Sequence, residues 1–132
     1  MRQRWMVLAC CLMATGVAGQ AQKAFPAKRY AFLKKVVDRH VGHAHFTRGM
    51  SMDTILALGR EAAEADIPVL AVMMNDPDDV TAMTAAEVLP TLGAEGIRAF
   101  KSAKTRLSKS DLDLYLGEAE DTKRRIEAQK RR

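Results

Sequence analysis

The sequence predicts an all-α protein of about six helices. Almost no stretch alternates apolar and polar residues as a half-buried strand does, whereas apolar residues recur at three- and four-residue steps. Capping residues, prolines and glycines stand at the ends of these stretches. With 48% hydrophobic and 28% charged residues, the composition is that of a globular domain. It excludes collagen, mucin-like stalks and a fully disordered chain.

The first two helices are expected at 27–41 and 51–65, with a loop at 42–50. Gly42 ends the first helix. Ser51 suits the start of the second, because its hydroxyl can accept a hydrogen bond from an amide of the first turn. Each helix has one apolar face. The apolar residues are Phe25, Tyr30, Leu33, Val37 and Val41 in the first helix, and Ile55, Leu56, Leu58 and Ala62 in the second.

Two more helices follow in the middle of the chain. Asp66 is the expected cap of a short helix that starts at Ile67. This helix is mostly apolar, so we expect it to be the most buried element. Asp78 caps the next helix, 79–92, near whose end Pro90 should kink or fray the backbone, because proline has no amide hydrogen.

The last two helices occupy the C-terminal third. Gly93 is a stop signal, and a fifth helix is expected at 94–104. Ser108 or Ser110 caps a long last helix that runs to about Gln129. Basic residues dominate the end of this helix, so its last turns are expected to project into solvent and fray.

A weak internal repeat runs through the middle of the chain. Leu-Gly pairs occur at 58–59 and at 92–93, 34 residues apart. Ile67 and Ile97, 30 residues apart, are each expected to open a helix after such a pair. A period of this length in a helical chain is typical of stacked helix pairs.

Between these marks, residues 57–103 resemble a short bacterial HEAT-type repeat. That family has an Ile-Pro-x-Leu first helix, an Asp-Pro-Asp turn, and an Ala-Ala-x-Ala-Leu second helix that ends at Leu-Gly. The matching segments here are Ile67-Pro68-Val69-Leu70, Asp76-Pro77-Asp78, Ala85-Ala86-Glu87-Val88-Leu89 and Leu92-Gly93. The resemblance implies a short HEAT-like array of stacked antiparallel helix pairs, and it motivates the hypothesis of a protein-binding module.

The sequence departs from the family pattern at two places. Thr81 and Ala82 stand where the family has a Val-Arg pair, and Pro90 replaces a glycine. In the family the arginine ties neighbouring repeats together, so a long regular solenoid is not expected. An irregular helical bundle that uses the same caps and alanines is the alternative.

The first 21 residues have the pattern of a secretory signal peptide. Arg2 and Arg4 precede an apolar stretch at 6–14, and small residues follow up to Ala21. We therefore expect a signal peptide at 1–21, a single domain at 22–132, and an exported protein in the periplasm or outside the cell. Cleavage after Ala18 or Gly19, a lipid anchor at Cys10 and a buried N-terminal helix are the alternatives.

Charge is distributed unevenly. Residues 23–48 carry a net +6, residues 49–96 a net −8, and residues 97–132 a net +5. The basic ends would either meet an anionic partner, such as a membrane surface or an acidic protein, or complement the acidic middle within one fold. Nucleic acid is not an expected partner, because few aromatic residues are present to stack on bases.

The three histidines form one cluster, His40, His43 and His45. Imidazole is a common ligand of zinc and copper, so the cluster is a candidate metal site. Met50 and Met52 follow closely as soft ligands for copper(I). The other interpretation is a polar helix end with solvated rings. No other cofactor is expected.

No catalytic motif is present. The sequence has no nucleophile elbow, phosphate-binding loop or zinc-protease helix. The aspartates at 76, 78 and 79 are better explained as a turn and a helix cap than as a calcium loop. The sequence therefore predicts an exported, non-catalytic protein-interaction or scaffold module, with a small metal-binding protein as the alternative.

Overall fold

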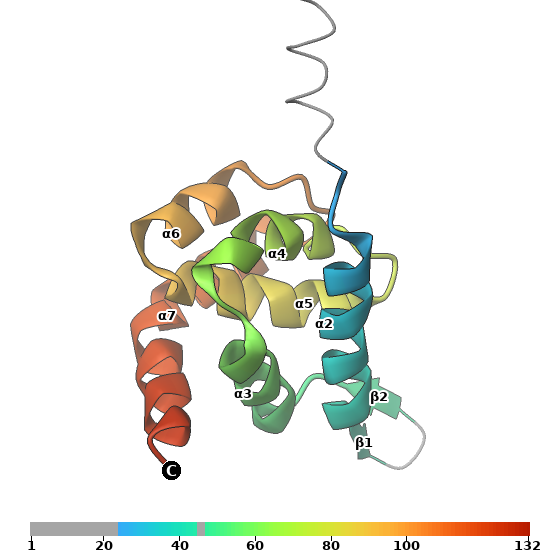
Figure 1. Ribbon diagram of the computed structural model, residues 1–132, viewed down its shortest axis with the longest axis vertical. Helices are drawn as coiled ribbons and strands as arrows, with labels where there is room; N and C mark the ends of the chain where they lie inside the picture. Colours follow the sequence, from blue (N-terminus) through green and yellow to red (C-terminus); the bar gives the residue numbers. More distant parts are fainter. Residues whose placement is uncertain (1–23, 45–46) are drawn as a thin grey trace, which may run out of the picture.

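The computed structural model describes residues 24–44 and 47–132, so the expected signal peptide lies outside the described residues. The described part is all-α, as predicted, with six α-helices (Figure 1). They are α2 (Ala27–His40), α3 (Met52–Glu61), α4 (Ile67–Met73), α5 (Asp79–Val88), α6 (Gly93–Ser102) and α7 (Lys109–Lys130).

Helix α5 lies at the centre of the fold and contacts α2, α3, α4 and α7 (Figure 1). It is the most thoroughly buried helix, with eight of its ten residues buried. The prediction that α4 would be the most buried element is therefore wrong, since α4 leaves Val72 49% exposed. Small side chains such as Ala82, Ala85 and Ala86 let neighbouring helices approach α5 from several sides, which outweighs the higher hydrophobicity of α4.

A single hydrophobic core joins the helices around α5. Its largest fully buried apolar side chains come from four of the six helices and from the turns that follow them. They are Leu33, Val37, Leu58, Val69, Leu70, Met73, Met74, Val88 and Leu89. Truncation of such a leucine to alanine typically costs about 2–5 kcal/mol, so these residues dominate the stability of the fold.

Three predicted helix caps are confirmed. The side chain of Ser51 accepts a hydrogen bond from the Thr54 amide at 3.2 Å, and that of Asp78 from the Thr81 amide at 3.3 Å. Ser108, rather than Ser110, caps α7. Asp66 makes no cap bond to α4. Its carboxylate accepts instead from the Ala63 amide, at the preceding 3₁₀ turn, Glu64–Asp66.

The expected loop at 42–50 contains a short hairpin. Strands β1 (Gly42–Ala44) and β2 (Thr47–Gly49) pair antiparallel, with Gly42 opposite Gly49. Strands of three residues are too short to produce a readable alternation of apolar and polar residues, so the sequence pattern could not distinguish them from a loop.

Helix α7 stays regular to Lys130 and packs onto the fold as far as Ile126, so the prediction that its last turns fray into solvent is wrong up to that residue. Beyond Ile126 every residue except Gln129 is exposed, as predicted. Ile126 is only 5% exposed and lies against Gly59 of α3. A Cβ atom on Gly59 would come within 2.3 Å of the Ile126 Cδ1. The missing side chain of Gly59 therefore allows α7 to lie close along α3.

The two Leu-Gly pairs of the internal repeat occupy different environments. Gly59 is a buried contact inside a helix, whereas Gly93 starts α6 with a φ of +82°, a conformation that favours glycine. Ile67 opens α4, but Ile97 lies in the middle of α6. Pro90 acts as predicted, because α5 ends at Val88 and a 3₁₀ turn, Leu89–Thr91, follows. HEAT-type stacking stays a prediction.

Candidate binding groove

The predicted metal ligands lie at the end of α2 and in the hairpin. His40 is exposed, and its Nδ1 lies 2.8 Å from the carbonyl oxygen of Val36, to which it donates. The backbone of His43 is in β1, and His45 lies outside the described residues. Among the residues that the structure describes, no three His, Cys, Asp or Glu side chains are grouped to hold a metal ion. The three-histidine site stays a prediction.

The most extensive polar network surrounds Asp76, in the turn between α4 and α5. Asp76 is 3% exposed, and its carboxylate accepts hydrogen bonds from the Tyr30 hydroxyl, from Lys34 Nζ at 2.9 Å and from the Asp78 amide at 2.9 Å. Burial alone would raise the pKa of Asp76. The hydrogen bonds from Tyr30, Lys34 and the Asp78 amide outweigh burial and lower that pKa below its usual value.

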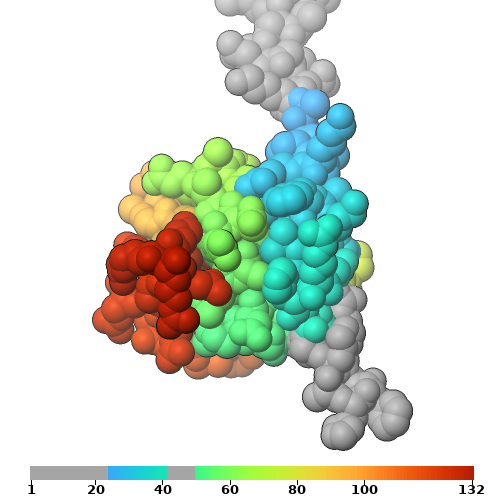
Figure 2. All heavy atoms as spheres, turned by 60° about the horizontal axis from the view of Figure 1, so that its bottom comes forward, coloured from blue at the N-terminus to red at the C-terminus, as the bar shows by residue number. Residues whose placement is uncertain are grey.

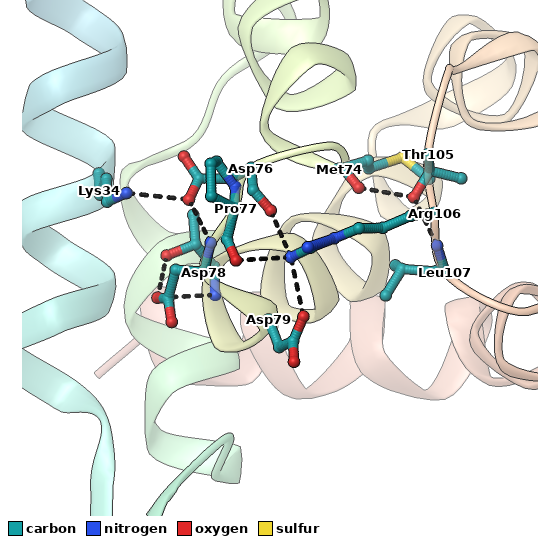
Figure 3. Close-up of polar contacts among 10 residues, drawn as sticks. Lys34, Met74, Asp76, Pro77, Asp78, Asp79, Thr105, Arg106 and Leu107 are labelled. Atoms are coloured by element: carbon teal, nitrogen blue, oxygen red, sulfur yellow. Dashed lines mark hydrogen bonds and ion pairs between the residues drawn. The ribbon is translucent and has the colours of Figure 1, made fainter.

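The segment between α6 and α7 attaches to the same turn through Arg106 (Figure 3). Arg106 Nη2 donates to the carbonyl oxygens of Asp76 and Pro77, both at 2.7 Å, and to the Asp79 carboxylate at 2.8 Å. Next to it, the hydroxyl of Thr105 donates to the Met74 carbonyl oxygen at 2.6 Å. These contacts hold a distant part of the chain on the α4–α5 turn.

A second ion pair joins α2 to the turn before α4. The guanidinium of Arg29 meets both carboxylate oxygens of Asp66, at 2.8 and 2.9 Å. The hydrogen bond from Arg29 is the main reason that the pKa of Asp66 is lowered. Both basic ends of the sequence thus pair with its acidic middle, which favours the interpretation that the charges complement one another within the fold.

Glu87 is a buried acid that the sequence pattern did not single out. It is 4% exposed between α5 and α7 and lies 3.4 Å from the Thr122 hydroxyl. Burial, together with the nearby Glu118 carboxyl, raises the pKa of Glu87 to about 7. The one available signal was an acid among the apolar residues of the predicted helix 79–92. Since its side chain is covered, a substrate would not reach it.

A long depression runs over α3, with α2 on one side and the end of α7 on the other. Figure 2 shows α3 between these two segments. It consists of two adjoining hollows of about 320 and 330 Å³ that share Asp53 and Gln129. We call it the α3 groove. It is lined by Phe32, Val36, Arg39, His40, Asp53, Leu56, Ala57, Arg60, Glu61, Arg125, Ala128, Gln129 and Arg132.

Most arginines of the α3 groove have no ion-pair partner among the described residues. Within the described residues, Arg39, Arg60 and Arg132 make no ion pair, whereas Arg125 pairs with Asp121 at 2.9 Å. The groove therefore differs from the Asp76 turn, where each charge has a partner.

Phe32 gives the α3 groove an exposed aromatic ring. It is 41% exposed, and the Arg29 guanidinium lies 5.1 Å from its centroid. Because Asp66 holds Arg29, the ring rests against a fixed cation. Of the residues that line the groove, the sequence pattern singled out His40, as a candidate metal ligand, but it did not indicate a groove, since one formed by three helices has no local signal.

A further hollow, of about 340 Å³, lies where α2, α4 and the segment after α6 meet. Tyr30, Val72 and Ala103 line it. Its acidic residue, Asp76, is already occupied by internal hydrogen bonds. It therefore offers an apolar surface with one exposed cation, Lys104, and less polar recognition than the α3 groove.

Comparison with known protein families, with curated proteins and with solved structures found no match. The HEAT-type resemblance thus receives no support from a relative, and the function of this protein is inferred from the geometry of its own residues. Among the described helices, none combines the length and the apolar character needed to cross a bilayer.

Proposed function

We propose that this protein is a non-catalytic protein-interaction module that holds a segment of a partner protein in the α3 groove. The observation that carries this proposal is the groove itself. It combines an exposed aromatic ring, Phe32, with arginines that have no ion pair among the described residues. Aromatic and arginine side chains are enriched at the centres of protein interfaces.

The positions of the perturbed acids support a role without catalysis. Asp66 and Asp76 are buried in ion pairs between helices, and Glu87 is covered by α7. Their shifted pKa values therefore have a structural cause, since ion-pair networks perturb a pKa just as an active site does. As part of the same proposal, the protein acts in the periplasm or outside the cell after removal of residues 1–21.

Site-specific photo-crosslinking in the producing cells tests this function. A photoreactive residue replaces Ala57 or Ala128, which line the α3 groove, and as a control Ala94, which is exposed on α6. We expect one partner protein to be cross-linked from both groove positions and not from Ala94. Absence of an adduct at both groove positions, or equal adducts at all three, would contradict the proposal.

The histidine cluster offers the competing function, a small metal-binding protein. The hydrogen bond from His40 Nδ1 to the Val36 carbonyl leaves Nε2 of the ring for a ligand. Calorimetric titration with zinc and copper, beside a variant with alanine at His40, His43 and His45, decides between them. Micromolar or tighter binding that the variant loses would favour the metal function.

A further inference from the structure

We infer that the segment held in the α3 groove is acidic and carries an apolar side chain that contacts Phe32. This inference depends on the proposed function and specifies the chemistry of the partner. Three features of the groove support it: the balance of its charges, its fixed aromatic ring, and its concave shape.

The charge balance favours an acidic occupant. Two acidic side chains line the groove, and both already face positive charge. Asp53 lies in the first turn of α3, where the helix dipole stabilises a carboxylate. The pKa of Arg29 is raised by its hydrogen bond with Asp66 and also by the charge of Glu61, so Glu61 faces a cation.

The arginines of the groove are not compensated in the same way. Arg39 stands on α2 and Arg60 on α3, both are exposed, and neither has an ion pair among the described residues. Arg132 adds a third such charge at the end of α7. Carboxylates of an occupant would meet guanidinium groups that have no ion pair among the described residues, and planar guanidinium groups bind carboxylates through paired hydrogen bonds.

The apolar part of the occupant is set by the ring of Phe32 and the groove floor. Leu56 and Ala57 are half-buried on the floor of the groove. Phe32 is held against Arg29 before any partner arrives, so little side-chain freedom is lost on binding. An apolar side chain seated between them would be shielded from water on several sides.

Gln129 lines both hollows and supplies a polar group at the centre of the groove. Its Oε1 atom is buried and has no hydrogen-bond partner within the described part of the chain. A carboxamide whose oxygen makes no internal bond can turn to pair with the backbone of a bound segment. Such a contact suits a peptide chain and does not depend on its sequence.

The concave shape favours a peptide segment over a membrane. The arginines come from α2, from α3 and from the end of the chain after α7, and they surround hollows that α3 lines from below. A flat anionic bilayer would touch the rims of the groove and leave the floor and Gln129 uncovered. A single chain can enter the groove and contact both sides.

The test is fluorescence anisotropy with labelled short peptides. The protein is purified from its producing cells, so that any processing of the chain by those cells has already taken place. The probe peptide carries glutamates on both sides of one phenylalanine. Its two controls replace the glutamates by glutamines or the phenylalanine by serine. We expect the probe peptide to bind and either replacement to weaken its binding about tenfold. Added salt should weaken the binding of the probe more than the binding of the two control peptides.

Matched charge reversals in the protein complete the test. The variant Arg39→Glu with Arg60→Glu should lose binding of the probe by about tenfold or more. The control Lys101→Glu with Lys109→Glu makes the same change in net charge at exposed positions outside the groove and should bind normally. If the charge-reversed variant folds poorly, the milder double variant Arg39→Gln with Arg60→Gln takes its place. This variant should have the same thermal stability as the unaltered protein and should still bind the probe peptide more weakly.

Two outcomes would overturn the inference. Equal binding of the glutamate and glutamine peptides, or no binding of either, would contradict an acidic occupant. Binding to vesicles of phosphatidylglycerol that depends on Arg39 and Arg60, without peptide binding, would assign the groove to a membrane surface. In the first case, cross-links from Ala57 and Ala128 to a partner would still uphold the proposed function, so the two failures can be told apart.

Discussion

The α4–α5 turn and the α3 groove use the same kinds of charged residues in opposite ways. At the turn, Asp76 is buried and accepts from three groups on two segments of the chain. At the groove, Arg39 and Arg60 are exposed, and the described residues give them no ion pair. Removal of one partner from a buried ion pair destabilises a fold, whereas charges left without partners around a recess are available for recognition.

Removal of the Asp76 carboxylate is expected to have the largest effect on stability. Asp76→Ala leaves Tyr30 and Lys34 without their acceptor, and we expect a loss of about 3 kcal/mol in the free energy of unfolding. Urea denaturation measures it. Asp79→Asn in the same turn is the control, since Asp79 is mostly exposed and should cost less than about 1 kcal/mol. Equal losses of unfolding free energy in the two variants would contradict the distinction between the buried, paired carboxylate of Asp76 and the exposed one of Asp79.

Glu87 is expected to make stability fall as pH rises. Its pKa is raised to about 7 in the folded protein, so between the ordinary value near 4.5 and about 7 the native state binds more protons than the unfolded state. The free energy of unfolding therefore decreases over this window and levels off above it. Glu87→Gln should stabilise the protein at pH 8 by on the order of 2 kcal/mol and have little effect at pH 4.

Thermal unfolding of both proteins across that range measures this effect. The acids and the phenol that face each other here are Glu87 on α5 and Tyr115 and Glu118 on α7. Glu118→Gln is the companion variant, because it removes the neighbouring charge and leaves Glu87 buried. It should reduce the pH dependence without abolishing it. A pH profile that Glu87→Gln leaves unaltered would assign the dependence to other groups.

Two glycines on the groove helices should respond to alanine with opposite signs. Gly59→Ala forces a methyl group against Ile126, and we expect a net loss of about 1–2 kcal/mol despite the better helix propensity of alanine. Gly117→Ala on α7 meets no atom within 4 Å and should gain about 0.5–1 kcal/mol. Chemical denaturation of both variants gives the comparison, and a stable Gly59→Ala would show that α7 is not closely packed on α3.

The groove arginines are expected to have the smallest effect on stability. Arg39→Gln and Arg60→Gln remove no ion pair within the described chain, so each should change the free energy of unfolding by less than about 0.5 kcal/mol. Differential scanning calorimetry checks this. A loss comparable to that of Asp76→Ala would mean that the arginines hold the fold together, and the contrast between the two regions would disappear.

Much of the secondary structure could be predicted from local signals. Ser51, Asp78 and Ser108 cap helices at the predicted places, Pro90 ends the regular part of α5, and Gly93 adopts its positive φ. These signals depend on a few neighbouring residues, so the sequence displays them directly. The hairpin escaped prediction because its strands are too short for a pattern.

The candidate site could not be predicted, because its residues are brought together by packing. Nothing near Phe32 in the sequence points to Arg60 or Gln129, and nothing near Asp76 points to Lys34, 42 residues away. The sequence by itself determined the all-α class, most of the helix starts and the uneven charge, but the second and fourth helices end at Glu61 and Val88, four residues before the predicted ends at 65 and 92. Only the tertiary structure decided which charges form ion pairs. It also placed α5 rather than α4 at the centre of the fold and brought Ile126 against Gly59. Local hydrogen bonding determines helices, whereas burial and ion pairing depend on which distant surfaces fit together.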